Sequence, residues 1–181
     1  MRAVIATSER VWLCSLKLSD REEFLRAVAA SIAHHRPWVY APANREQWSA
    51  YARKRNADDA RAMVVRRRDD GALVGVINLN NIIGGGLQQA FVGYYGLTPH
   101  LGRGYMTEGL KLVVEHAFVD LRLHRLEANI QPGNEPSKKL ASRVGFRYEG
   151  FSPRYLQVGG EWRDHERWAM VSDDQPAVRS G

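Results

Sequence analysis

The stretch HLGRGYMTE, residues 100–108, lies between a run that predicts a strand, Ala90–Leu97, and a run that predicts a helix, Thr107–Asp120. Gly102 and Gly104 stand where the strand gives way to the helix, and a residue without Cβ lets the backbone approach a ligand closely. The first turn of a helix adds unpaired N–H groups and the positive end of the helix dipole, which both favour phosphate. The pattern, with an arginine between the glycines, therefore suggests a pyrophosphate cradle.

Other phosphate-binding glycine motifs are missing from the chain. It has no GxGxxG that opens a strand–helix unit with an acidic residue about twenty positions later, so a dinucleotide fingerprint is unsupported. It also has no GxxxxGK[ST] loop. The triplet Gly84–Gly86 lies between two strand-like runs, Leu73–Ile83 and Leu87–Gly96, and favours a hairpin turn.

The composition is that of a single globular domain. The 181 residues suffice for one substantial core, and 44% hydrophobic with 25% charged residues is ordinary for such a domain. No apolar run approaches the roughly 18 residues of a membrane-spanning helix, and residues 1–10 lack signal-peptide character. The one cysteine, Cys14, lies in an apolar strand-like run. We therefore expect a buried structural thiol and a cytoplasmic protein with no membrane partner.

The net charge of +6 could serve a nucleic acid, a ribosomal surface or a polyanionic cofactor. The basic residues are scattered, and the densest run, Arg66–Arg68, precedes Asp69–Gly71 and is interpreted as the solvated flank of a hairpin turn. No recognition motif supports direct nucleic-acid binding. The histidines lack metal-ligand spacing, so no metal is expected.

Hydrophobic periodicity predicts a mixed α/β domain. The expected elements are a strand at 11–16, a helix from a Ser19–Glu22 capping box to about 31, a helix from Asn44 to about 55, strands at 63–68, 73–83 and 88–97, a helix at 107–120, a strand at 125–130, a helix from Asn134 to about 144, and strands at 146–157 and 162–171. Antiparallel strands followed by strand–helix alternation imply a mixed sheet with helices on both faces. We expect one domain over residues 8–172 and a flexible tail at 173–181.

A second strand–helix junction follows at Asn134–Ser137. Asn134 is a good helix N-cap and Pro136 is tolerated in a first turn, whereas Ser137 has no such structural duty. Two neighbouring strands that each end in a helix N-terminus form a splayed pair. A long polyphosphate cofactor could thread between them, with its diphosphate on the first helix and its reactive end near the second.

With these segments the chain resembles the GNAT acetyltransferase superfamily, and within it the ribosomal-protein-alanine N-acetyltransferase group. The resemblance covers about residues 11–170. It rests on the order and spacing of RPW at 36–38, GVINLNN at 75–81, VGYY at 92–95, GRGYMTE at 102–108, NEPS at 134–137, VGFRYEG at 144–150, YL at 155–156 and WRDH at 162–165. It implies a mixed, V-split sheet with acetyl-CoA in the split.

The resemblance also implies roles for individual residues. Backbone amides would hold the pyrophosphate, the strand near Tyr95 would pair with the pantetheine through main-chain hydrogen bonds, and Ser137 would protonate the leaving thiolate. The implied cofactor-binding residues are Tyr95, Leu97, Leu101, Gly102, Arg103, Gly104, Tyr105, Met106 and Asn134. The acceptor pocket is expected around Trp38, Tyr155 and Trp162.

The general base is left open by the sequence. Arg154 stands where some relatives carry a carboxylate, and the other candidates, Glu108, Asp164 and His100, each have a structural alternative. An α-amine with a pKa near 8 is already roughly a quarter neutral near pH 7.4, whereas a lysine amine is neutral at only about one part in a thousand. A site without a strong base therefore favours an N-terminal amine over a lysine.

We therefore expect an N-acetyltransferase that uses acetyl-CoA as co-substrate and acts by direct attack of a neutral amine, without a covalent enzyme intermediate. The expected acceptor is a protein N-terminus, such as that of a ribosomal protein. Two alternatives stay open: acetylation of a small amine (an antibiotic, a polyamine or an amino acid), and a non-catalytic acetyl-CoA sensor. The oligomeric state also stays open, a homodimer included.

Overall fold

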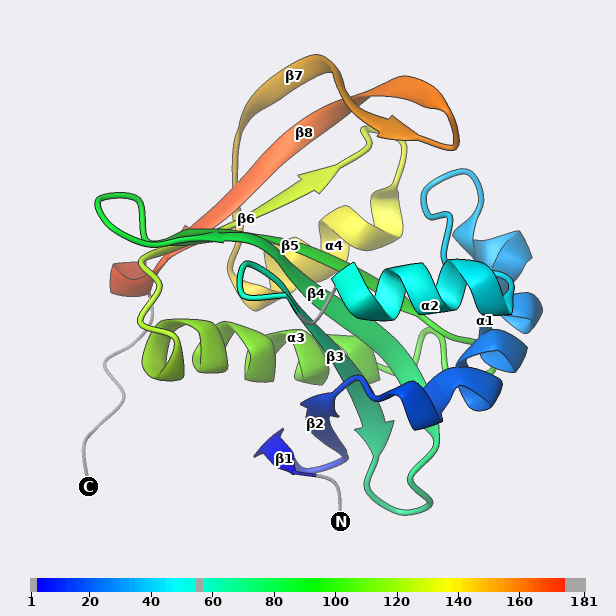
Figure 1. Cartoon of the computed structure of the whole chain (residues 1–181). Helices are drawn as coiled ribbons and strands as arrows, with labels where there is room; N and C mark the ends of the chain where they lie inside the picture. The colour runs from blue at the N-terminus through cyan, green and yellow to red at the C-terminus, as the bar shows by residue number, and fades with distance from the viewer. Residues whose placement is uncertain (1–2, 55–56, 175–181) are drawn as a thin grey trace, which may run out of the picture.

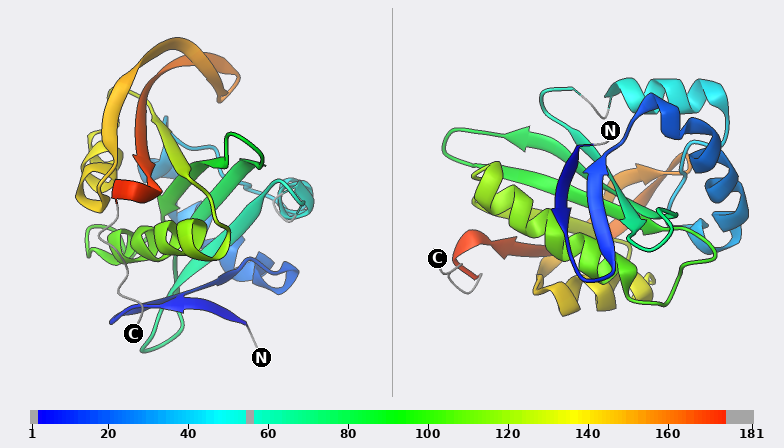
Figure 2. Two further views of the ribbon diagram at one scale, coloured as in Figure 1. Left: turned by 90° about the vertical axis from the view of Figure 1, so that its left-hand side faces the viewer. Right: turned by 90° about the horizontal axis from the view of Figure 1, so that it is seen from below.

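Figures 1 and 2 show the computed structural model of the protein, which describes residues 3–54 and 57–174. These residues form an eight-stranded sheet with the strand order β1-β2-β3-β4-β5-β6-β8-β7. The strands are β1 Val4–Thr7, β2 Val11–Ser15, β3 Arg61–Arg67, β4 Leu73–Ile83, β5 Gln89–Gly96, β6 Arg125–Ile130, β7 Arg147–Val158 and β8 Glu161–Val171. All neighbouring strands are antiparallel except β5 and β6, which are parallel.

Helices cover both faces of the sheet, as Figure 2 shows. Helices α1 (Arg21–His35) and α2 (Arg45–Lys54) lie on one face, and α3 (Tyr105–Glu115) and α4 (Glu135–Val144) lie on the other. Helix α3 continues into a π-helical turn at His116–Asp120. Within the described part of the chain, no helix is long and apolar enough to span a membrane. The predicted mixed sheet with helices on both faces is confirmed.

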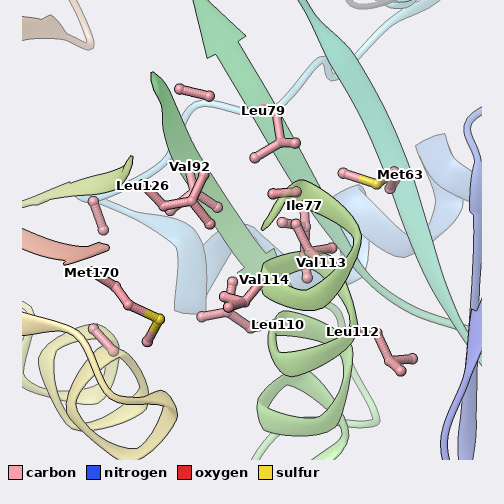
Figure 3. Close-up of a cluster of buried hydrophobic side chains, with 14 of the residues drawn as sticks. Met63, Ile77, Leu79, Val92, Leu110, Leu112, Val113, Val114, Leu126 and Met170 are labelled. Carbon is pink, nitrogen blue, oxygen red and sulfur yellow. The ribbon is translucent and has the colours of Figure 1, made fainter. Parts of the chain in front are cut away.

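The larger core lies under α3 (Figure 3). Leu110 and Val113 of α3 pack with Ile77 of β4, and all three are fully buried. Each such side chain contributes about 1.5–3 kcal/mol to stability. A Cβ on Gly109 would lie only 2.5 Å from a methyl of Val65, so the helix rests directly on β3 at this glycine. This tight packing fixes where α3 begins, at the edge of the site.

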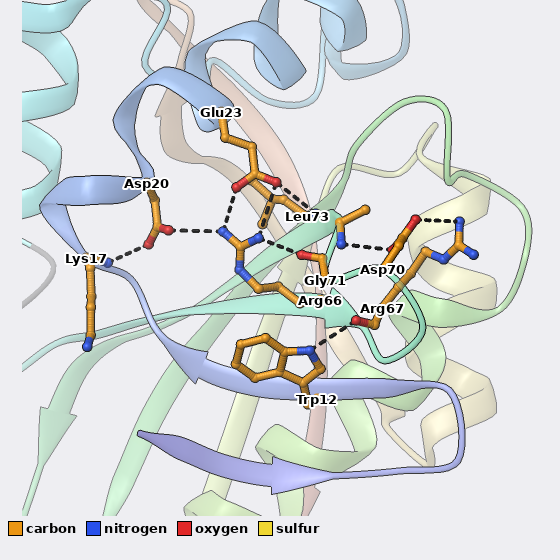
Figure 4. A network of polar contacts seen from close by, with 10 residues as sticks. Trp12, Lys17, Asp20, Glu23, Arg66, Arg67, Asp70, Gly71 and Leu73 are labelled. Atoms are coloured by element: carbon orange, nitrogen blue, oxygen red, sulfur yellow. Dashed lines mark hydrogen bonds and ion pairs between the residues drawn. The ribbon is translucent and has the colours of Figure 1, made fainter. Parts of the chain in front are cut away.

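The interpretation of residues 66–68 as a solvated flank is wrong for Arg66, which is 5% exposed. Its guanidinium lies 3.0 Å from Asp20 Oδ1 and 2.7 Å from Glu23 Oε2, and Figure 4 shows how it ties the start of α1 to the sheet. A buried charge is tolerated when it is paired and hydrogen-bonded in this way. The hairpin turn that follows it is where the sequence predicted it.

Most predicted elements appear within a few residues of their expected ends. Asn44 caps α2 as predicted, since its Oδ1 accepts a hydrogen bond from the N–H of Gln47 at 2.9 Å. The capping box at Ser19 is wrong, because Asp20 instead accepts from the N–H of Lys17 at 2.7 Å. Strand β1 was not predicted, and Ser172–Asp174 forms a short 3-10 turn after β8. Residues 175–181 of the expected tail lie outside the described residues.

Candidate active site

The sheet opens into a V between its two parallel strands. Strands β5 and β6 pair only from Gln89–Phe91 to Arg125–Glu127 and then diverge, as Figure 1 shows. The N–H of Leu97 donates to the carbonyl of Val74 in β4 at 2.9 Å. Because main-chain groups alternate sides along a strand, Gly96 and Tyr94 direct theirs into the V. Consistent with this, the Gly96 carbonyl lies 2.8 Å from Nε2 of His35, within the V.

A cavity of about 440 Å³ lies at the V on the side where α3 and α4 begin, and we call it the basic cavity. Among the described residues its lining includes the basic side chains His34, His35, His100, Lys139 and Arg143, and it has no Asp or Glu. Burial, followed by the charge of Arg67, lowers the pKa of His100. The positive charge of the basic cavity therefore comes from Lys139 and Arg143, with no competing carboxylate in the described lining.

The glycine loop forms one wall of the basic cavity. Gly102 and Gly104 have φ angles of +73° and +82°, a left-handed conformation that favours glycine. The N–H groups of residues 102–106 have no hydrogen-bond acceptor among the described residues, whereas Thr107 already donates to the Gly104 carbonyl at 3.0 Å. Such a row of free N–H groups at a helix N-terminus is suited to an anion.

Arg10 supports the glycine loop from behind. Its Nη1 donates to the Arg103 carbonyl at 3.1 Å, and its Nε donates to Glu108 Oε1 at 2.6 Å. Glu108 also accepts from the Ser8 hydroxyl at 2.7 Å. Burial would raise the pKa of Glu108, but the hydrogen bonds from Ser8 and Arg10 outweigh it and lower that pKa. Glu108 is thus a stably ionised brace, and it lines neither cavity at the V.

A second cavity, of about 420 Å³, lies at the V on the side of α2 and the β7–β8 hairpin. We call it the carboxamide cavity, because its polar lining is dominated by Asn78, Asn80, Asn129, Gln131, Asn134 and Gln157. Within the described lining there is no Asp, Glu, Lys or Arg. A Cβ on Gly93 of β5 would have only the Asn80 amide nitrogen within 4 Å, at 3.8 Å, so this glycine keeps the cavity floor open.

The two cavities meet at Ser137 and Tyr94, which line both. The Ser137 hydroxyl donates to the Tyr94 hydroxyl at 3.0 Å, and the Tyr94 hydroxyl donates to the Ser137 carbonyl at 2.9 Å. Asn134 caps α4 by accepting from the Ser137 N–H at 3.3 Å, which fixes the position of the serine. Burial raises the pKa of Tyr94 to about 12, although the hydrogen bond with Ser137 opposes this. The junction is therefore a pair of neutral hydroxyls.

The loop between α1 and α2 covers the junction and reaches the β7–β8 turn (Figure 1). Trp38 lines both cavities, and a Cβ on Gly133 would come within 3.0 Å of its ring. The Trp38 carbonyl accepts from Gln131 Nε2 at 3.3 Å. The ring of Tyr40 stacks on the Arg36 guanidinium, 3.4 Å from the ring centroid, and lies directly over Gly159. The loop is thus attached at both ends of the carboxamide cavity.

The structure brings together most of the site residues implied by sequence, but not all. At the two cavities lie Trp38, Tyr95, Leu101, Gly102, Gly104, Tyr105, Met106, Asn134 and Ser137. Leu97 is buried in the core and its N–H is bonded to β4, and the Arg103 side chain is exposed outside both cavities. Trp162 is 61% exposed and Tyr155 packs against His165, and neither lines a cavity.

Sequence reasoning missed Tyr94, His165 and, apart from Asn134, the carboxamides. A signal for the carboxamides was present, because Asn78 and Asn80 stand two apart on a strand and must share one face. Tyr94 faces Ser137 only because the V brings β5 beside the first turn of α4. Asp164, a candidate base, lies outside both cavities and accepts from the Arg154 N–H at 2.7 Å.

Known proteins share this architecture. Residues 10–147 match the family model described as an acetyltransferase (GNAT) domain. The chain is 35% identical over 130 residues to the probable N-acetyltransferase YjcK of Bacillus subtilis, and this alignment spans 72% of each protein. It is 33% identical over 106 residues to the ribosomal protein uS5-alanine N-acetyltransferase of Escherichia coli, and that alignment spans 59% of this chain and only 55% of the relative.

A solved structure, Mycobacterium smegmatis RimJ in complex with CoA-disulfide, superposes with a TM-score of 0.83 and 30% identity over 92% of this chain and 84% of the other. The protein therefore belongs to the GNAT acetyltransferase family. It is an N-acetyltransferase built on a single mixed sheet with helices on both faces.

Proposed function

We propose that the protein transfers the acetyl group of acetyl-CoA to the N-terminal α-amine of a peptide or protein, such as a ribosomal protein. The observation that carries this proposal is the meeting of two unlike cavities at Ser137 and Tyr94, one basic and one uncharged and rich in carboxamides. Two relatives agree with the two parts of this proposal: one was solved with CoA-disulfide, and the other is named for an alanine of a ribosomal protein.

The basic cavity suits a coenzyme A arm. The N–H groups of residues 102–106 would bind the diphosphate, and Lys139 and Arg143 would lie near its negative charges. The main-chain groups of Tyr94 and the N–H of Gly96 would pair with the pantetheine amides as an added strand does, while the Gly96 carbonyl is already bonded to His35. Acetyl-CoA supplies the acetyl group as a thioester.

The carboxamide cavity suits a peptide N-terminus. A carboxamide both donates and accepts hydrogen bonds, as a peptide backbone does, so these side chains can satisfy a short stretch of main chain. A polyamine would require carboxylates to pair with its charges, and a free amino acid would require a cation for its carboxylate. The described lining offers neither. This favours a peptide, whose charge in the cavity is confined to the reacting amine, over small amines that carry further charges.

Ser137 is the proposed proton donor to the departing thiolate. The neutral Tyr94 hydroxyl is its hydrogen-bond partner. A thiolate leaves readily, so this proton donor contributes little. We expect Ser137→Ala to lower kcat about 10-fold while CoA affinity is retained. The buried Cys14 thiol fits the cytoplasm as the proposed location.

The test is release of CoA thiol from acetyl-CoA with three acceptors in parallel: peptides with a free N-terminal Ala or Ser, the same peptides N-blocked with an internal Lys, and a panel of small amines. Release confined to the free N-termini supports the proposal. Release confined to small amines contradicts the acceptor assignment. Acetyl-CoA binding without any turnover supports the sensor function instead and removes the role of Ser137.

A further inference from the structure

The carboxylates considered as bases all lie outside the carboxamide cavity, but one imidazole lines it. His165 of β8 is 3% exposed and is the one histidine in the described lining of this cavity. Its ring packs edge-on against Tyr155, with 6.3 Å between the ring centroids. A side chain this buried is held in one orientation, so the fold fixes the position of the His165 ring.

Hydrogen bonding decides which nitrogen of His165 can accept a proton. Nδ1 lies 2.9 Å from the carbonyl oxygen of Arg163. A carbonyl only accepts, so Nδ1 carries the hydrogen and Nε2 holds the lone pair. Nε2 has no hydrogen-bond partner among the described residues. The ring is therefore a neutral imidazole whose basic nitrogen is unused by the fold.

The surroundings of His165 keep it neutral. Burial lowers its pKa, and the hydrogen bond to the Arg163 carbonyl and the charge of Asp164 only partly offset this. From β7, the group that packs against the ring is the neutral phenol of Tyr155. The pKa of His165 is consequently lower than that of an ordinary histidine, which favours the neutral ring that can accept a proton.

We propose that His165 is the catalytic residue that removes a proton from the acceptor amine, a role that rests on the proposed transfer to an amine in the carboxamide cavity. The acceptor enters as an ammonium, and one N–H proton passes to Nε2. The freed lone pair forms the N–C bond to the acetyl carbon as the C–S bond breaks. The thiolate takes a proton from the Ser137 hydroxyl, and the second proton that leaves the nitrogen as the amide forms restores that hydroxyl. His165 then releases its proton to solvent, so the balance is RNH₃⁺ plus thioester giving amide, thiol and H⁺.

If His165 is the base, the loss of kcat/KM on replacing it should depend on pH. A purely structural role would give a loss that does not change with pH. At about pH 6.5 only about 3% of an α-amine with a pKa near 8 is neutral, whereas at about pH 9 most of it is. We therefore expect His165→Gln to lower kcat/KM about 30-fold at the lower pH, with the deficit shrinking toward unity at the higher pH.

The experiment measures kcat/KM against pH for the wild type and for His165→Gln, with whichever amine of the acceptor panel is turned over. His124→Gln is the matched control, since His124 is exposed and its ring bonds only to the Ser172 hydroxyl in the described chain. If the ratio of wild-type to His165→Gln kcat/KM falls as the pH rises, the proposal is supported. If that ratio is constant with pH, or stays near 1, the proposal is overturned.

A second readout needs no variant and no turnover. Titration of the His165 ring in the wild-type protein by NMR should show a hydrogen on Nδ1 and a midpoint below 6.5. A ring protonated at neutral pH, or the opposite tautomer, overturns the proposal even if His165→Gln misfolds. Turnover of small amines alone would contradict the proposed peptide acceptor and leave the His165 measurement intact, so the two failures are distinguishable.

Discussion

The two cavities of the V share Ser137, Tyr94 and Trp38, yet they recognise their ligands by different chemistry. The basic cavity uses main-chain N–H groups from a left-handed glycine loop and cationic side chains at its rim. The carboxamide cavity uses neutral side chains on β4, β6 and the β7–β8 hairpin, and no formal charge in its described lining. A ligand suited to one is therefore poorly suited to the other.

This difference indicates where specificity resides. In the proposed function, main-chain groups would bind the phosphates common to every CoA ester, so the basic cavity would distinguish little beyond charge. Neutral amides in a partly enclosed site disfavour ligands with charges beyond that of the reacting amine, because such a charge buried there would lack a partner. Under the proposed function, the absence of charged side chains in the carboxamide cavity would select the acceptor, and changes to one cavity should leave the other largely intact.

Among substitutions that should affect one cavity and not the other, Gly93→Val should have the largest effect. The strand accommodates a β-branched residue, but its methyl groups would fill the floor of the carboxamide cavity beside Asn80. We expect acceptor kcat/KM to fall about 100-fold while the Kd for CoA, measured by calorimetry, changes less than about twofold. Gly86→Val, in an open turn, is the control. Equal losses in both measurements would refute the separation of the cavities.

Charge reversal in the basic cavity should have the next largest effect. Lys139→Glu with Arg143→Glu should weaken CoA binding about 30-fold at low salt, and the deficit should shrink in high salt because these side chains are exposed. The acceptor KM at saturating acetyl-CoA should not change. The double variant Arg53→Glu, Lys54→Glu on α2 makes the same change of charge away from the V. If it weakens CoA equally, the effect is one of net charge alone.

At the junction itself, Tyr94→Phe removes the partner of the Ser137 hydroxyl. We expect kcat to fall about 5-fold with little change in KM, because the substitution removes one hydrogen bond. Because burial raises the pKa of Tyr94 to about 12, its phenol stays neutral through the assay range. The ratio of wild-type to variant kcat should then be flat from about pH 7 to 10. A ratio that varies in that range would mean that Tyr94 itself ionises.

The smallest effect is expected for Trp162→Ala. The sequence placed Trp162 in the acceptor pocket, but its side chain is 61% exposed and lines neither cavity. We expect acceptor KM to change less than about twofold. Trp38→Ala is the informative companion, since Trp38 lines both cavities and its loss should weaken both ligands. A large effect of Trp162→Ala on the acceptor KM would show that the hairpin closes over the substrate.

Local signals in the sequence were enough for the elements and for the anion cradle. Strand β6 and helix α4 have their predicted bounds. The start of α4 could be predicted because Asn134 and Pro136 mark a helix start by local geometry alone. Strand β1 was missed because its exposed, mixed residues carry little periodicity. Arg66 was misplaced because its burial depends on Asp20 and Glu23, which lie more than forty residues away.

The sequence by itself determined the mixed sheet, the glycine loop and the family, because these depend on periodicity, caps and spacing along the chain. Only the tertiary structure decided the chemistry across the V: the Ser137–Tyr94 pair, the uncharged cavity, and the free Nε2 of His165. These features join side chains from β4, β5, β6, α4 and β8, which extend along the chain from Asn78 to His165. Their proximity follows from the divergence of β5 and β6, and no local interaction encodes it.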